Sequence, residues 1–201
     1  MTKRIPLLVT AIAVCGVVGV LLSPVASAAT FNANRIMDDG VFDNPLTMNS
    51  ATIDNFLNQF PSSCISPNHG FRAPVPTGYS PGSGFSYGGN DTAGAVIATA
   101  AQVYNVNPQV LITTLQKEQS LVTGGRSDGC PAIAYTAAMG YGCPDSGGGY
   151  NYTGVNLYSI NGVTVSTVNG TCVNSSAKAG FSQQVIRAAW LLKFSEQRSK
   201  G

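Results

Sequence analysis

One segment of the chain carries a complete helical signal, from an N-terminal cap to a glycine stop. Asn107 is a favourable N-cap residue, Pro108 suits the first helical position, and Thr123-Gly124-Gly125 ends the pattern. Side chains at three- and four-residue spacing share one stripe of this helix, namely Leu111, Thr114, Leu115, Glu118 and Val122. The sequence therefore predicts an amphipathic helix that packs its leucines against a core.

Glu118 stands out in this stripe because it places a carboxyl group where the leucines point. It is one of only two glutamates in 201 residues. We expect burial and the negative end of the helix dipole to favour its protonated form, which suits a general acid. The alternative is a partly exposed glutamate beside Lys117, and the helix pattern alone favours neither interpretation.

The first 28 residues have the pattern of a secretory signal peptide. Lys3 and Arg4 precede an apolar run at positions 5–22, and Ala26-Ser27-Ala28 forms a small-residue cleavage site. A retained membrane anchor is the alternative, but two prolines and the cleavage site favour removal. We therefore expect a secreted or cell-wall associated protein that begins at Ala29 and keeps no stable membrane anchor.

The charge of the mature chain argues against nucleic acid as a partner. Without Lys3 and Arg4, nine basic residues balance nine acidic ones. No basic run or mixture of aromatic and basic residues is present. The polarity comes instead from Ser, Thr, Asn and Gly, which is typical of many exported proteins that handle sugars.

Four cysteines remain after removal of the signal: Cys64, Cys130, Cys143 and Cys172. An even number in an exported chain predicts two disulfides, and three pairings are open. We favour Cys64 with Cys130 and Cys143 with Cys172. No C-x-x-C pair occurs and His69 is the only histidine, so the pattern predicts neither a zinc site nor another cofactor.

The remaining pattern predicts a mainly α fold (α+β) with one small β-hairpin. Residues 29–90 form an amino-terminal part with a Pro/Gly-rich loop over 61–90, and residues 91–201 form the main domain. We expect the hairpin to be the only sheet, and the last helix to direct its apolar residues from Phe181 to Phe194 toward the core. The predicted elements are helices at 50–60, 92–104 and 177–199, the first two capped by Ser50 and Asp91, and a hairpin at 152–168 with an Asn161-Gly162 turn.

The order of these elements and four short motifs resemble the lysozyme-like superfamily, in particular lytic transglycosylases and goose-type lysozymes. The motifs are NPQVL at 107–111, QKEQS at 116–120, AMG at 138–140 and AAWLLKF at 188–194. In that family, a helix of the type P-x-L-h-x-x-h-h-x-x-E-S ends in the catalytic glutamate, and a G-L-M-Q turn lines the cleft. A later A-x-x-Y-L-x-x-L helix packs behind, and the match covers roughly residues 91–199.

The resemblance implies a lysozyme-like domain that cleaves peptidoglycan or another β-1,4-linked aminosugar polymer, with Glu118 as general acid/base. It implies that Gln119, Ser120, Met139 and Tyr141 contact the substrate; Tyr135 is a weaker candidate. No cofactor is implied.

This chain also departs from the family pattern. Gln119 stands where the family has serine, and Gly140-Tyr141 follows Met139 where the family has glutamine. The given sequence ends at Gly201 where the family continues into another helix, a pattern expected of a truncated or a minimal version of the domain. The strings LQKEQSL (115–121) and AMGYGCPD (138–145) are more closely similar to secreted bacterial proteins of unsettled activity.

Two aspartates are candidates for a second carboxylate. Asp128 precedes Gly129 and Asp145 follows Pro144, and both patterns are typical of structural turns. Most glycosidases need two carboxylates, whereas a transglycosylase needs one because the sugar's acetamido group and 6-hydroxyl do the remaining work. The alternative function is a glycan-binding or adhesin-like surface module on the same scaffold, without cleavage.

Overall fold

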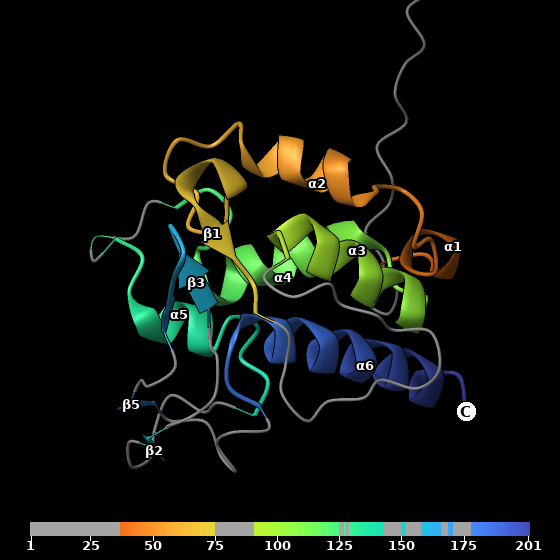
Figure 1. Cartoon of the computed structure of the whole chain (residues 1–201). Helices are drawn as coiled ribbons and strands as arrows, with labels where there is room; N and C mark the ends of the chain where they lie inside the picture. Colours follow the sequence, from red (N-terminus) through yellow and green to blue (C-terminus); the bar gives the residue numbers. More distant parts are fainter. Residues whose placement is uncertain are drawn as a thin grey trace, which may run out of the picture. The chain divides into compact units, whose positions relative to one another are not determined.

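The computed structural model describes residues 37–74, 91–124, 127, 129–142, 150–151, 158–165, 169–170 and 178–201. These belong to one compact unit, residues 37–201. It is mainly helical with a small antiparallel sheet, which confirms the predicted fold class at that level (Figure 1). The predicted signal peptide lies outside the described residues. Within them, no helix is long and apolar enough to cross a membrane.

Helix α3 (Ala93–Tyr104) lies between α2 (Ser50–Leu57) and α6 (Phe181–Ser199) (Figure 1). Its small residues allow this close packing: a Cβ on Gly94 would lie 2.5 Å from both Asp54 Oδ1 and the Ser50 carbonyl oxygen. The N-cap is Thr92, whose hydroxyl accepts from Ala95, and not the predicted Asp91. Asp54 adds a second cap from α2 by accepting from the Gly94 N–H at 2.9 Å.

Helix α4 (Pro108–Gln119) begins as predicted and ends earlier. The Asn107 side chain accepts from the Gln109 N–H at 2.9 Å, and Pro108 occupies the first turn. The helix stops at Gln119 because Ser120 adopts a left-handed conformation with φ 53°, before the predicted glycine stop. Gln116 Oε1 then accepts from the N–H groups of Val122 and Thr123, which fixes the chain beyond the helix.

The predicted hairpin is present as β3 (Tyr158–Ile160) and β4 (Val163–Val165). Its turn residues Asn161 and Gly162 both have positive φ, as an Asn-Gly turn requires. The expectation that it is the only sheet is wrong, because β1 (Phe71–Arg72) pairs with β3, and β2 (Tyr150–Asn151) pairs with β5 (Asn169–Gly170). Strand β1 and the short helix η1 (Pro67–His69) also lie in the stretch predicted to be irregular.

An aromatic cluster joins the sheet to the helices. Phe71 stacks on Tyr135 of α5 (Ala132–Thr136), and Tyr135 stacks on Tyr158. Tyr135 is buried and donates its hydroxyl to the Cys64 carbonyl at 3.0 Å, so it belongs to the core and is not a cleft residue. The Cys64–Cys130 disulfide next to it confirms that predicted pairing. Cys143 and Cys172 lie outside the described residues.

Helix α6 begins at Phe181, after Gly180 with φ 98°, and its first half is buried. Its second half is only partly covered: Leu192 still packs against the core, but the prediction that Phe194 faces the core is wrong, because this residue is 45 % exposed. An ion-pair cluster joins this end of α6 to the segment that follows α1 (Asp39–Phe42). In it, Lys193 Nζ lies 2.7 Å from Asp43 Oδ1 and 3.1 Å from Glu196 Oε2.

Candidate functional site

Glu118 lies in the last turn of α4, and its side chain is 32 % exposed. Its Oε1 lies 3.1 Å from Lys117 Nζ. The expectation that Glu118 is buried with the leucines is therefore wrong, and the alternative of a partly exposed glutamate beside Lys117 describes the structure. The physical reason is local coverage: Leu111 and Leu115 are fully buried, whereas the segments packed on α4 leave Glu118, one turn further on, partly uncovered, although Leu121 and Val122 beyond it are buried again.

The Glu118 carboxylate lies directly against Gly140. A Cβ on this glycine would lie 3.0 Å from Glu118 Oε2, a distance at which the neighbour would have to move. Gly140 also has φ 68°, a conformation that other residues adopt only with strain. Two strings that the sequence singled out, around Glu118 and around Met139-Gly140, are therefore neighbours in space.

Gln184 of α6 holds the turn that carries Gly140. Its Oε1 accepts from the N–H groups of Met139 and Tyr141, at 3.2 and 3.0 Å. Its Nε2 donates to the carbonyl oxygens of Tyr141 and Lys178, at 3.0 and 2.5 Å. Gln184 is fully buried. The sequence interpretation missed this residue, although an amide between the buried Phe181 and Val185 of one helix was a visible signal.

The side chains of the turn differ in what they offer to a ligand. Met139 is 5 % exposed and belongs to the core, so it shapes the turn more than it presents a surface. Tyr141 is partly buried, and Lys178 Nζ lies 5.9 Å from its ring centroid. Gly142 has φ 59° and lies against the Lys178 side chain.

The other predicted site residues fall into two groups. Gln119 and Ser120 are partly buried at the end of α4, where Ser120 is the C-cap and donates its N–H to the Gln116 carbonyl at 2.9 Å. Both residues directly follow Glu118 in the chain, and Ser120 ends the helix as its C-cap. Asp128 and Asp145 lie outside the described residues.

His69 is exposed, and its Nδ1 lies 2.6 Å from the Ser63 carbonyl oxygen. Across the described ranges, no group of three or more His, Cys, Asp or Glu residues is arranged to hold a metal ion.

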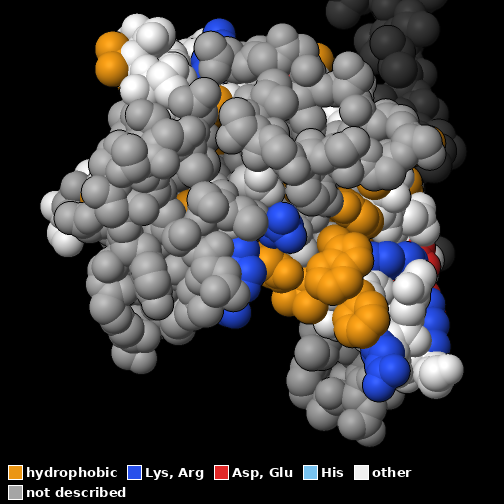
Figure 2. Space-filling view, turned by 60° about the horizontal axis from the view of Figure 1, so that its bottom comes forward, with side chains coloured by type: hydrophobic (Ala, Val, Ile, Leu, Met, Phe, Trp, Pro, Cys, Tyr) orange, Lys and Arg blue, Asp and Glu red, His pale blue; other side chains and the backbone are white. Residues whose placement is uncertain are grey.

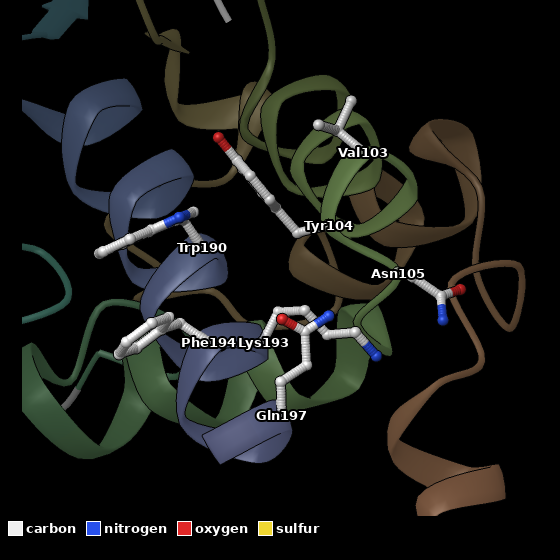
Figure 3. A pocket seen from close by; sticks show the side chains of 7 residues that line it. All are labelled: Val103, Tyr104, Asn105, Trp190, Lys193, Phe194 and Gln197. Atoms are coloured by element: carbon white, nitrogen blue, oxygen red, sulfur yellow. The ribbon is translucent and has the colours of Figure 1, made fainter. Parts of the chain in front are cut away.

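Pockets lined by described residues lie at three places away from Glu118. One of about 360 Å³ lies between the ends of α3 and α6 (Figure 3). A second of about 270 Å³ lies beside the start of α4, and a third of about 340 Å³ lies beside the Cys64–Cys130 disulfide. Glu118 lines none of these three.

Comparisons of the chain with protein-family models, with curated proteins and with solved structures find no match.

Proposed function

We propose that the protein is a secreted, lysozyme-like glycan-cleaving protein that acts on peptidoglycan, with Glu118 as the general acid/base. The observation that carries the proposal is the contact between the Glu118 carboxylate and Gly140. In the family that the sequence resembles, a helix-terminal glutamate and a Met-containing turn form the two sides of the reaction centre. The meeting of the corresponding strings supports the same use here.

The exposure of Glu118 is compatible with a polymeric substrate. A glycan strand is too long to enter an enclosed cavity, so the acid must be reachable from the surface. Lys117 is 79 % exposed, and its ammonium group can move away when a sugar approaches. Glu118 would protonate the glycosidic oxygen as its bond to C1 breaks, and the resulting carboxylate would take the proton of the sugar's 6-hydroxyl, whose oxygen bonds to C1 and closes a 1,6-anhydro ring.

The buried Gln184 contributes rigidity to this proposed centre. Three hydrogen bonds from this side chain fix the backbone on both sides of Gly140, and a fourth ties it to the Lys178 carbonyl. A backbone held in this way keeps its position relative to the acid without rearrangement during the reaction. We therefore propose that Gln184 positions the turn and does not itself touch the substrate.

A second candidate function is glycan binding without cleavage. The observation that favours it is the ion pair between Glu118 and Lys117. A carboxylate beside an ammonium group is well suited to accept hydrogen bonds from sugar hydroxyls. In this alternative, the same surface recognises wall glycan but breaks no bond.

The experiment that separates these functions is digestion of purified peptidoglycan by the wild type and by Glu118→Gln. The amide keeps the shape of the side chain and loses the proton, so cleavage should fall at least about a hundredfold while thermal unfolding is unchanged. Lys117→Gln is the matched control and should keep most activity, because the carboxyl remains.

Mass spectrometry of the products tests the reaction type. We expect 1,6-anhydro ends, which are lighter than hydrated ends by one water. Hydrated ends, together with lost activity in Asp128→Asn or Asp145→Asn, would instead indicate a hydrolase with two carboxylates. Absence of cleavage by the wild type, with glycan retained on the protein, would refute the enzyme and support the binding module.

A further inference from the structure

The second half of α6 exposes large apolar side chains in a continuous group. Trp190, Leu191 and Phe194 are 44, 41 and 45 % exposed. The rings of Trp190 and Phe194 are stacked, with centroids 5.4 Å apart and an interplanar angle of 16°. Figure 2 shows apolar side chains gathered on one face, with Lys and Arg side chains around them. Exposed stacked aromatic rings on a secreted protein are an expected feature of a binding surface.

A pocket of about 360 Å³ lies beside the stacked rings, within the size range of small-ligand sites. It combines aromatic walls with side-chain amides, and Figure 3 shows that its residues come from the adjoining parts of α3 and α6. We call the stacked pair and this pocket the aromatic face. The residues that line the pocket are Val103, Tyr104, Asn105, Trp190, Lys193, Phe194 and Gln197.

The charges in this pocket are already balanced. Lys193 is 17 % exposed on its side chain, and its Nζ contacts both Asp43 Oδ1 and Glu196 Oε2. An anionic group entering the pocket would have to compete with these two carboxylates. The amides of Asn105 and Gln197 remain as neutral hydrogen-bonding groups in the lining. The pocket therefore favours a neutral ligand that is apolar on one side and polar at its edge.

A pyranose ring has this character, since its C–H face packs on an aromatic ring while its hydroxyl and acetamido groups reach amides. We propose that the aromatic face binds a sugar ring of an aminosugar glycan, as a second contact for the polymer outside the Glu118 site. The proposal rests on the proposed function for the choice of glycan. The basic side chains around the face suit the carboxylates that wall glycans carry on their peptides.

The aromatic face and the residue that holds the turn beside Glu118 lie at different points along α6. Trp190 and Phe194 lie six and ten positions beyond Gln184, which holds the turn beside Glu118. At 1.5 Å of rise per residue, they are about 9 and 15 Å further along the helix axis. At 3.6 residues per turn they also point to another side of α6 than Gln184, so the aromatic face is a contact separate from the Glu118 site.

Trp190 is the only tryptophan of the chain, so its fluorescence reports on this face alone. The Glu118→Gln variant, which should not cleave, is titrated with the tetrasaccharide of β-1,4-linked N-acetylglucosamine. We expect a saturable change in fluorescence, and a loss of affinity of about tenfold in the added Phe194→Ala variant. Leu191→Ala is the matched control, because Leu191 is similarly exposed but does not line the pocket, and its affinity should be unchanged.

Several results would overturn the inference: no fluorescence response to the sugar, equal losses in Phe194→Ala and Leu191→Ala, or a response only to vesicles containing phosphatidylglycerol. Sedimentation that shows self-association lost in Phe194→Ala, without sugar binding, would indicate a second copy on this face. Thermal unfolding of each variant checks the fold. Cleavage by the wild type without a fluorescence response would refute this inference alone. A response without cleavage would refute only the enzyme.

Discussion

Replacing the buried Gln184 by methionine tests the turn beside Glu118 most directly. Methionine keeps the length and flexibility of the side chain but makes none of its four hydrogen bonds. Four backbone groups would then lose the Gln184 amide as a hydrogen-bond partner: the N–H groups of Met139 and Tyr141, and the carbonyl oxygens of Tyr141 and Lys178. A buried polar group without a partner costs about 1–3 kcal/mol. Because Tyr141 and Lys178 are only partly buried and water can reach them, we expect a loss of roughly 3–5 kcal/mol.

Urea unfolding followed by circular dichroism measures this loss. Gln183→Met is the matched control, because Gln183 is also buried on α6, but its side-chain oxygen accepts a single, longer bond from Arg187 Nε at 3.3 Å. We expect about 1 kcal/mol for this control. If the two variants differ by less than about 0.5 kcal/mol, Gln184 does not hold the turn in the way described. A Gln184→Met protein that stays folded should also cleave or bind glycan less well, because the backbone beside Glu118 is no longer fixed.

Three further predictions follow from the described contacts. Gly140→Ala should cost about as much stability in thermal unfolding as Gly129→Ala, because both glycines have positive φ and the nearest neighbour of Gly140 is the movable end of the Glu118 side chain. Gly140→Ala should weaken cleavage or binding of glycan more, because the added Cβ would lie 3.0 Å from Glu118 Oε2, and equal effects of the two variants on glycan would contradict this closeness to the acid. Replacing Cys64 and Cys130, which are 66 positions apart, by alanine should lower the free energy of unfolding by about 4 kcal/mol relative to the oxidised wild type. Urea unfolding of both proteins measures this difference, and an unchanged unfolding midpoint would rule out the stabilisation. Burial raises the pKa of Tyr135, so the stability that its neutral hydroxyl contributes is present below pH 10 and is lost as the pH rises above 10. The loss of unfolding free energy at high pH should therefore be smaller in Tyr135→Phe than in the wild type. The same pH dependence in both proteins would show that Tyr135 does not cause it.

Local signals in the sequence predicted the main helices but not all of their ends: the N-cap of α2 is Asn49 and not the predicted Ser50, α2 ends at Leu57 and not at 60, and α6 begins at Phe181 and not at 177. The Asn107-Pro108 start and the Asn161-Gly162 turn depend on backbone preferences of the residues themselves, so both appear in the structure as expected. Helix ends that depend on contacts with other parts of the fold were less predictable. Helix α4 ends before Ser120 and not at the glycines beyond, because Ser120 adopts a left-handed conformation that serine rarely takes and that the sequence pattern does not predict.

Long-range features could not be predicted from periodicity. The pairing of β1 with β3 joins Phe71 to Ile160, and a two-residue strand leaves no alternating pattern to find. The same limit explains Glu118 and Phe194. Both occupy the apolar stripe of a helix, but whether a stripe is covered depends on which other segments reach that part of the helix.

The sequence predicted which motifs form the candidate site, but not how their residues are arranged in space. Glu118 and the Met139-Gly140 turn were both identified from the sequence, and the structure brings them into contact. Gln184 was overlooked because a glutamine on a helix is ordinarily a surface residue. Its significance depends on four backbone groups that only the folded chain brings to it.

The Cys64–Cys130 disulfide also has a consequence for the order in which the chain folds. Strand β1 follows Cys64 closely, and its partner β3 lies further along the chain beyond Cys130. In the reduced chain, pairing Phe71 with Ile160 must close a loop of about 90 residues, whereas the covalent link shortens this path to about 40. The entropic free-energy cost of closing that loop is then smaller by about 0.7 kcal/mol, which corresponds to roughly a threefold faster encounter of the two strands. Oxidation before sheet formation would therefore give the folding chain a kinetic advantage in addition to stability.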